Sequence, residues 1–378
     1  DQITEMVKAS GLRGRGGAGF PTGTKWSFLP EGSYPRYLVV NGDEGEPSTF
    51  KDRMLVERDP HQLLEGIAIA CYACQLDTAY FFIRGEYHHQ AKVVEKAIQE
   101  AYAKGIFGKQ GLLNGKSKFA VDCYLHRGAG AYICGEETGL LEAIEGRRGW
   151  PRLKPPFPAV KGLFGRPTII NNVETLAAVS PIVDRGLSWW KGLGCESNIG
   201  GAPSYGMKLM GVSGHVNRPG VYECDLGIPL KDLVEKHCLG MRGGKKFKGA
   251  IAGGVSMGIL GPDQFDAPMD FDIGRRCDRT DREGVRVAGA GRDPRHKDAE
   301  GSGTRLPAQG RRLQRERLVA VHEQWRARQA VRLQRASRLR RIVWRERARR
   351  RRHLQRRVQE GARSVRQAAP AGAAQVRR

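Results

Sequence analysis

The composition of the chain changes abruptly near residue 274, and this break limits where a folded core can form. Residues 274–378 contain 31 arginines and one lysine against 10 acidic residues, with no Phe or Tyr. Such a segment cannot bury enough apolar surface to offset the entropy lost on ordering. Residues 1–273 contain 32 basic and 30 acidic residues, the balance of an ordinary globular protein. We therefore expect the folded domains within residues 1–273.

Two interpretations of the Arg-rich tail remain open. An arginine-rich arm binds nucleic acid through phosphate contacts. A segment read out of frame from GC-rich DNA also has excess Arg, Ala and Gly with little Lys. A selected basic arm usually mixes Lys with Arg and interleaves aromatic residues for stacking. We therefore favour a frameshifted or disordered tail over a nucleic-acid partner. The chain starts with Asp1 rather than Met, which suggests that its natural start is missing.

Neither a membrane span nor a metal site is indicated. No stretch approaches the roughly 18 apolar residues that a transmembrane helix needs. The single CxxC, Cys71 to Cys74, ends an apolar helical run instead of opening a helix, and no second CxxC completes a zinc site. We expect both thiols to be buried and inert, because free cysteines usually pack as small hydrophobic residues.

The hydrophobic pattern of the first half alternates between strand and helix signals. Runs of apolar residues predict strands, and apolar residues on one stripe predict amphipathic helices. The predicted strands cover residues 37–40, 79–83 and 119–125. The predicted helices cover residues 2–9, 60–76, 91–104 and 134–144, and a further helix within 169–178, while 149–167 is expected to be an ordered loop. This order indicates an α/β domain with a largely parallel sheet. From residue 207 onward, short strands and a helix at 229–237 indicate a small α+β unit.

Two glycine-rich turns are the main candidates for a ligand site. Residues 14–19 fit GxGxxG, but a helix precedes them and prolines follow, so the dinucleotide-binding context of a preceding strand and following helix is missing. Glycines still let backbone N–H groups approach a phosphate closely. A second turn, residues 127–132, follows a predicted strand. Two such loops near strand ends indicate one large ligand that carries phosphates.

Polar and aromatic residues near these turns indicate a nucleotide and flavin site. Carboxylates are suited to hydroxyl or amide groups, amides to ring or phosphate oxygens, and aromatic rings either to stacking or to the core. No Ser-His-Asp arrangement is present, so a hydrolase is the poorer interpretation. These residues are Asp43, Glu44, Glu46, Glu136 and Glu137; Asn171 and Asn172; and Phe20, Trp26, Phe28 and Phe157.

Four long motifs in order resemble a known family. They are residues 14–23 (GRGGAGFPTG), 41–47 (NGDEGEP), 128–138 (GAGAYICGEET) and 151–157 (PRLKPPF), and residues 170–175 continue the match. Together they resemble the flavin-bearing NADH dehydrogenase component of respiratory complex I, which in bacteria is the NADH-quinone oxidoreductase. Diaphorase subunits of NAD-reducing hydrogenases and formate dehydrogenases are similar. The resemblance covers roughly residues 3–273.

The resemblance implies three segments and a reaction. Residues 1–205 would be a Rossmann-like FMN- and NADH-binding α/β domain, residues 206–273 a ubiquitin-like (β-grasp) ligand-binding module, and residues 274–378 the tail. NADH would give a hydride to FMN, which passes electrons singly toward iron–sulfur clusters and finally quinone. The alternative is a diaphorase subunit of an NAD-linked hydrogenase or formate dehydrogenase. The chemistry then belongs to the cofactors, and the protein orients them.

The same resemblance implies roles for individual residues. Tyr132 and Glu136 would line the flavin, and Glu137 would hold the nicotinamide end; these are the implied catalytic residues. The implied FMN-binding residues are Gly14, Arg15, Gly16, Gly17, Gly19, Lys25, Asn41, Asp43, Glu46, Gly135, Asn171, Asn172 and Thr175. The implied NADH-binding residues are Phe20, Phe28, Glu137, Lys154 and Phe157.

Cofactors, partners and location also follow from the resemblance. FMN and NAD(H) are expected, and the family carries a [4Fe–4S] cluster as well. This sequence has no cysteine after Cys277, so the four-cysteine motif for that cluster is absent from it. The implied partners are NADH, a thioredoxin-like [2Fe–2S] subunit and a large iron–sulfur subunit. The implied location is peripheral, on the cytoplasmic side of the inner membrane, or cytoplasmic for a diaphorase.

Overall fold

The computed structural model describes residues 2–109, 119–196, 202–254 and 257–273. The elements below all lie in one compact unit, Asp1–Ala288. The Arg-rich tail, predicted as residues 274–378, lies outside the described residues, and so does Cys277.

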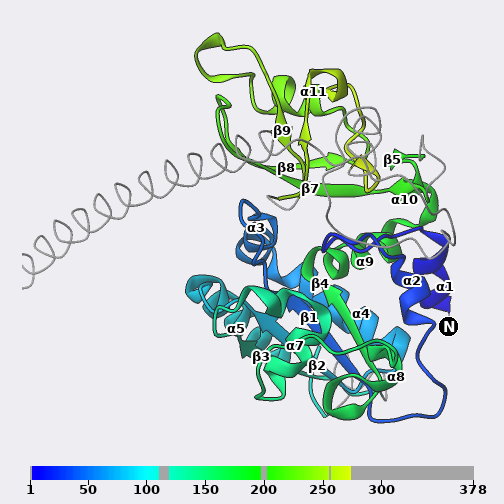
Figure 1. Cartoon of the computed structure of the whole chain (residues 1–378). Helices are drawn as coiled ribbons and strands as arrows, with labels where there is room; N and C mark the ends of the chain where they lie inside the picture. Colours follow the sequence, from blue (N-terminus) through cyan, green and yellow to red (C-terminus); the bar gives the residue numbers. More distant parts are fainter. Residues whose placement is uncertain (1, 110–118, 197–201, 255–256, 274–378) are drawn as a thin grey trace, which may run out of the picture. The chain divides into compact units, whose positions relative to one another are not determined.

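A parallel sheet forms the centre of the N-terminal region (Figure 1). Its strand order is β3-β2-β1-β4, and each neighbouring pair runs parallel. The prediction of a parallel-sheet α/β domain is therefore confirmed. The strands are β1 (Tyr37–Gly42), β2 (Thr78–Ile83), β3 (Asp122–Arg127) and β4 (Thr168–Asn172).

Strand β4 corrects the prediction of a helix within 169–178. Thr168 to Asn172 are extended and pair with Tyr37 to Asn41 of β1, and the helix begins only at Val173. Most of this segment is buried, and the β-branched Ile169 and Ile170 suit a strand that is covered on both faces, although β4 stands at the edge of the sheet. Its helix-like appearance comes from Asn172, which is the N-cap of the following helix: its side chain accepts a hydrogen bond from Glu174 N.

Helices cover both faces of this sheet (Figure 1). Because side chains alternate along a strand, Leu38 and Val40 pack in one core and Val39 in the other. The helical elements are α1 (Gln2–Ala9), α2 (Thr22–Trp26), α3 (Lys51–Arg58), α4 (Pro60–Cys74), α5 (His88–Ala103), η1 (Tyr132–Gly135), α7 (Glu137–Ile144), α8 (Pro158–Lys161), η2 (Leu163–Gly165), α9 (Val173–Arg185) and α10 (Leu187–Lys191).

Several predicted boundaries differ from the structure, for example the strand predicted at residues 119–125, which is β3 at Asp122–Arg127. The segment predicted as one helix over 134–144 is a 3₁₀ turn, η1, followed by α7, which starts at Glu137. The break exists because Glu136 is extended and caps α7 through its side chain. The segment 149–167, predicted as a loop, contains the single turn α8 as well as η2. Pro158 stands at the first position of α8, where its missing N–H has no partner to lose.

Helices α4 and α9 approach each other closely at Gly66. A Cβ at this position would lie 1.9 Å from the Leu176 carbonyl oxygen, so only glycine allows the observed packing. Asp59 caps α4 by accepting a hydrogen bond from Gln62 N, and Pro60 follows at the first turn. Because α9 follows β4 without a break, its N-terminal end lies at the carboxyl edge of the sheet.

The second part of the unit consists of short antiparallel strand pairs around a helix. Met207–Val212 (β7) pairs with Gly220–Asp225 (β8), and their apolar side chains pack with those of the helical turns after Pro229. The remaining elements are β5 (Gly194–Cys195), β6 (Ser204–Tyr205), α11 (Leu230–Asp232), the π-helical turn η3 (Leu233–His237), η4 (Arg242–Gly244), β9 (Ala250–Ile251), β10 (Ile259–Leu260) and η5 (Pro262–Gln264). Within the described residues, no helix is long and apolar enough to cross a membrane.

Candidate functional site

The candidate site lies at the carboxyl edge of the sheet, between β1 and β4. From β1 the chain adds β2 and β3 on one side of β1, whereas β4 pairs with β1 on the opposite side. The direction in which strands are added therefore reverses between β1 and β4. Open α/β sheets bind ligands at such a point. Asn41 and Asn172, both predicted cofactor-binding residues, are partners in the β1–β4 register. The sheet therefore brings together two motifs that are 131 positions apart in the sequence.

The first glycine loop, residues 14–19, lies against the start of α9. Arg15 N donates a hydrogen bond of 2.8 Å to Thr175 Oγ1, and a Cβ at Gly16 would lie 3.2 Å from Asn172 Cβ. Gly17 has φ +130°, a conformation that L side chains rarely adopt, and nothing lies within 4 Å of its missing Cβ. The loop is thus held at the strand end and has open space beside Gly17, as a backbone phosphate cradle requires.

The Arg15 side chain points away from this open space. Its guanidinium is buried, donates to the Tyr205 and Met207 carbonyl oxygens at 2.9 and 3.1 Å, and lies near the Trp190 and Phe271 rings. Burial lowers the pKa of Arg15 to about 10. Arg15 therefore anchors the loop to the β7 region through its side chain, and only its backbone faces Thr175.

A buried charged cluster, which the sequence did not reveal, lies below the loop. Glu174 forms ion pairs with Lys51 at 2.7 Å and Lys208 at 3.7 Å, and accepts a hydrogen bond from Leu209 N at 2.8 Å. Burial would raise the pKa of Glu174, but the charges of Lys208 and Lys51 lower it to about 2; burial lowers the pKa of Lys208 to about 8. The signal that could have found Glu174 is its place two residues after Asn172.

This cluster also reaches the predicted site directly. Asn172 Nδ2 donates to Asp52 Oδ2 at 2.7 Å, and Asp52 accepts from Lys51 at 2.5 Å. Asn171 Oδ1 in turn accepts from Trp26 Nε1 at 2.9 Å. Trp26 is 2 % exposed, so of its two expected roles, stacking surface or core, it has the core role. Both asparagines are therefore held rigidly at the strand end.

The second glycine loop is joined to the end of β1. Asn41 Nδ2 donates to the Gly135 carbonyl oxygen at 2.9 Å, and Asn41 Oδ1 accepts from Asp43 N at 3.1 Å. The Tyr132 hydroxyl donates to Glu46, and the Tyr132 ring is 60 % exposed. Four predicted residues therefore lie together beside the Gly135 backbone. They are Asn41 from β1, Asp43 and Glu46 from the acidic turn after it, and Tyr132 from η1.

The two acidic residues that follow β1 have different environments. Glu44 accepts hydrogen bonds from the first N–H groups of α3 and from the Tyr87 hydroxyl, so its role is to cap that helix rather than to meet a ligand as expected. Asp43 Oδ2 is buried without a hydrogen-bond partner, and burial raises the pKa of Asp43 to about 6. An unpaired buried carboxylate oxygen is costly, so Asp43 fits a ligand hydroxyl or N–H donor.

The N-terminus of α7 carries alternating charges. Glu137 accepts from Lys25 Nζ at 2.9 Å and from Lys154 Nζ at 2.7 Å, while Glu136 caps α7 and lies 3.3 Å from Lys154. Burial would raise the pKa of Glu137, but the two lysines lower it. Lys25 comes from α2, just after the first glycine loop, so this pair connects the surroundings of the two loops.

Exposed aromatic side chains lie on the same chain segments as Lys25 and Lys154. The rings of Phe20 and Phe28 lie 6.1 Å apart and are about half exposed. Phe157, at the N-cap of α8, is 57 % exposed, and no ring contact in the described part of the chain joins it to that pair. Trp150, 73 % exposed and absent from the prediction, lies on the same loop as Lys154. Exposed aromatic rings offer faces on which a planar ligand can stack.

Neither metal chemistry nor thiol chemistry is indicated within the described residues. No group of three His, Cys, Asp or Glu side chains is suited to a metal ion there. Cys71 and Cys74 are buried, and burial raises the pKa of Cys74 to about 12, so the interpretation of the CxxC as inert thiols is confirmed.

Comparisons with known proteins agree with this geometry. Residues 7–181 match the Nuo51 FMN-binding domain, and residues 209–260 match the SLBB domain. An NADH-quinone oxidoreductase subunit of Rhizobium meliloti is 54 % identical over 273 residues, which are 72 % of this chain and 63 % of the relative. The mitochondrial NADH dehydrogenase [ubiquinone] flavoprotein 1 of Dictyostelium discoideum is 50 % identical over 277 residues, 72 % of this chain and 56 % of the relative.

A solved structure shows the same fold. A chain in the air-oxidised NAD⁺-reducing [NiFe]-hydrogenase aligns with a TM-score of 0.62 at 40 % identity, over 72 % of this chain and 45 % of that one. The present chain thus spans about 45 to 63 % of the length of these proteins. The chain therefore contains a Nuo51 FMN-binding domain at residues 7–181, followed by an SLBB domain at residues 209–260.

Proposed function

We propose that this chain binds FMN and NADH and oxidises NADH as the flavoprotein subunit of a larger electron-transfer complex. The observation that carries the proposal is the convergence of both glycine loops at the carboxyl edge of β1 and β4. Asn41 and Asn172 are register partners there, and the Lys25–Glu137 ion pair joins the two sides. This is the place where an open parallel sheet binds a nucleotide.

The residues at this edge fit FMN. Gly17 leaves open space for a phosphate beside the backbone of the loop, and Lys25 adds positive charge. Asp43 has a buried carboxylate oxygen without a partner, which suits a ribityl hydroxyl or a flavin N–H. A bound FMN would supply the redox chemistry, namely two-electron acceptance from a nicotinamide and one-electron release. The protein itself would orient the flavin and the nicotinamide, balance charge and exclude water.

We assign the remaining residues on the same basis. Tyr132 and Glu46, which are hydrogen-bonded to each other, would flank the flavin with Glu136, and the buried Thr175 would support the phosphate loop. The NADH-binding side would be the exposed aromatic and charged group next to it: Phe20, Phe28, Glu137, Lys154 and Phe157. In this assignment Gly14, Gly19, Gly135 and Asn171 shape the walls of the pocket, and the Arg15 side chain supports the loop from behind.

We propose the domain limits 1–205 and 206–273, with a ubiquitin-like (β-grasp) fold for the second. The name NADH-quinone oxidoreductase, borne by relatives 51 to 54 % identical, supports quinone as the final acceptor. The proposed partners are a thioredoxin-like [2Fe–2S] subunit and a large iron–sulfur subunit. The proposed location is the cytoplasmic side of the inner membrane.

The second candidate is a diaphorase subunit of an NAD-linked hydrogenase, located in the cytoplasm. The structural match to a chain of an NAD⁺-reducing [NiFe]-hydrogenase favours it, but at 40 % identity this match is weaker than those to the quinone enzymes. Identification of the subunits that co-purify with the chain distinguishes the two.

The test is reconstitution with FMN followed by NADH turnover. The full chain is expected to become yellow, to retain FMN at micromolar concentration and to reduce ferricyanide with NADH. A protein that retains no FMN under these conditions would contradict the proposal.

A further inference from the structure

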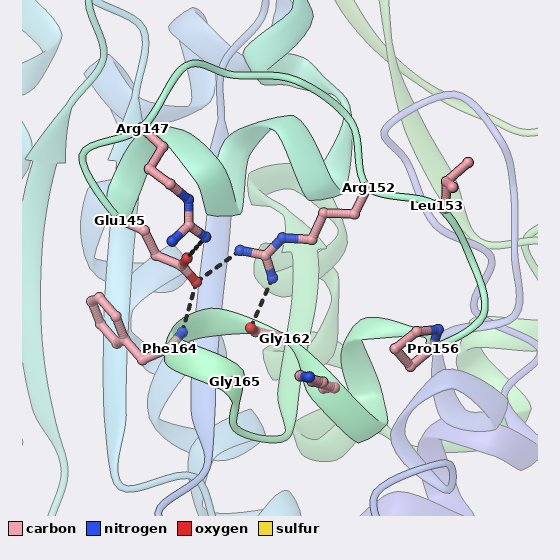
Figure 2. A pocket seen from close by; sticks show the side chains of 9 residues that line it. Glu145, Arg147, Arg152, Leu153, Pro156, Gly162, Phe164 and Gly165 are labelled. Carbon is pink, nitrogen blue, oxygen red and sulfur yellow. Dashed lines mark hydrogen bonds and ion pairs between the residues drawn. The ribbon is translucent and has the colours of Figure 1, made fainter.

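Four charged side chains form a cluster at the C-terminal end of α7. They are Glu142, Glu145, Arg147 and Arg152, and we refer to them as the α7 charge cluster. Figure 2 shows three of them, Glu145, Arg147 and Arg152, at a cavity of about 460 Å³. The carboxylate of Glu145 also accepts a hydrogen bond from Phe164 N at 2.7 Å. The cluster thus ties the end of α7 to the turn at η2.

Arg152 makes most of the connections in this cluster. Its guanidinium contacts Glu142 at 2.5 Å, Glu145 at 2.8 Å and the Gly162 carbonyl oxygen at 2.9 Å. Its backbone N donates to Thr138 Oγ1, on the first turn of α7, at 2.8 Å. One residue therefore holds the loop against both ends of α7 and against the turn before β4.

The same loop carries Lys154 two residues further on. Lys154 reaches Glu137 at 2.7 Å and Glu136 at 3.3 Å, at the N-terminus of α7. The intervening Leu153 is 92 % exposed and so gives the loop little packing of its own. The side chains of Glu142 and Glu145 are only 14 % and 6 % exposed, so the pairs that hold Arg152 are well shielded from solvent.

We propose that Arg152 is a positioning residue for NADH, which acts by setting the place of Lys154 relative to Glu137. The inference rests on the proposed function, because Lys154 and Glu137 belong to the proposed NADH-binding side. Arg152 itself points into the α7 charge cluster, where its guanidinium contacts Glu145 and the Gly162 carbonyl oxygen (Figure 2).

Only arginine suits this arrangement. Its planar fork contacts two carboxylates and a carbonyl oxygen at once, whereas a lysine ammonium is a compact charge that lacks this geometry. Arg152→Lys therefore keeps the charge but loses the fork. We expect it to be intermediate between the unsubstituted chain and Arg152→Gln in its affinity for NADH.

The experiment compares Arg152→Gln, Arg152→Lys and the control Arg148→Gln in the full FMN-reconstituted chain. Arg148 is an exposed arginine on the same loop and stands outside the charge cluster. We expect Arg152→Gln to raise the KM for NADH and the calorimetric Kd for NAD⁺ by roughly fivefold, the effect of about one lost hydrogen bond. FMN content and kcat should change less than about twofold, and Arg148→Gln should leave all four values unchanged.

A double-mutant cycle with Lys154→Gln tests the route of the effect. In the Lys154→Gln background, Arg152→Gln should raise the Kd for NAD⁺ by less than about twofold, because the group that it positions is already lost. Additive effects, or an unchanged KM and Kd in Arg152→Gln, would overturn the inference. If Arg152→Gln does not fold, Arg152→Lys decides the question by the same criteria. An unsubstituted chain without NADH turnover would instead contradict the proposed function, and this inference with it.

Discussion

Lys25 Nζ and Glu137 Oε2 form an ion pair of 2.9 Å between residues that are 112 positions apart. Lys25 follows the first glycine loop, and Glu137 opens the helix after the second. Both side chains are about one-quarter exposed, so solvent screens the pair only in part. The pair lies where the proposed FMN and NADH sites adjoin. Because Lys25 is assigned to FMN and Glu137 to NADH, substitution of one partner can separate the two roles.

Glu137→Gln should raise the KM for NADH while FMN is retained. The substitution removes the charge that holds Lys154 and the proposed acceptor for the nicotinamide amide, a loss of about 1–3 kcal/mol for a charge-assisted hydrogen bond. Steady-state kinetics with ferricyanide and the flavin absorbance of the purified protein measure the two effects. A Glu137→Gln protein without flavin would show that this carboxylate has been assigned to the wrong ligand.

Phe271→Ala should weaken FMN binding from a distance. The Phe271 ring lies 4.5 Å from Arg13 and 5.4 Å from Arg15, and it is in contact range of the Cβ position of Gly19. Phe271 is partly buried, so removal of its ring takes packing away from behind the glycine loop at a cost of about 1–3 kcal/mol. The Kd for FMN, measured by fluorescence quenching, should rise severalfold. The matched substitution Phe164→Ala, far from the glycine loop in the α7–η2 region, should leave this Kd unchanged.

Glu174→Gln should lower stability and flatten its dependence on acid pH. The pKa of Glu174 is about 2 in the folded protein against an ordinary value of 4.5, so its contribution is complete above the ordinary value and is lost as pH falls toward the folded value. That contribution is about 3 kcal/mol. We would measure the free energy of unfolding in urea at pH 7 and at about pH 3. Between these pH values Glu174→Gln should lose less of this free energy than the unsubstituted chain does. Equal losses in the two proteins would contradict the assignment of this pKa.

Gly66→Ala should destabilise the chain although alanine is the better helix former. The added methyl would lie 1.9 Å from the Leu176 carbonyl oxygen, so α4 and α9 would have to separate. We expect a loss of about 3 kcal/mol or more, against the ~1 kcal/mol gain from helix propensity. Thermal unfolding measures the balance, and a Tm equal to or above that of the unsubstituted chain would show that the two helices can move apart freely.

Much of the local structure followed from sequence patterns. The strand at 37–40, the helix at 60–76 and the rejection of a dinucleotide finger at 14–19 all depend on neighbours within a few residues, and the structure agrees with each. Strand β4 was predicted as a helix because Asn172 is a good N-cap, whereas its pairing with β1 depends on residues 131 positions away. Local patterns cannot report such a partner.

The features of the candidate site also fall into two groups, those that depend on near neighbours in the sequence and those that depend on distant segments. Residue types and near neighbours were enough to indicate which segments carry the site, since glycine turns, carboxylates and aromatic rings are recognised from them. Three further features came from the packing of distant segments: Glu44 caps α3, the Arg15 guanidinium turns toward β7, and Glu174 is buried between two lysines. The reason is physical: whether a charged side chain meets a ligand or another charge depends on the order in which the strands pair and on what the packed helices then leave exposed.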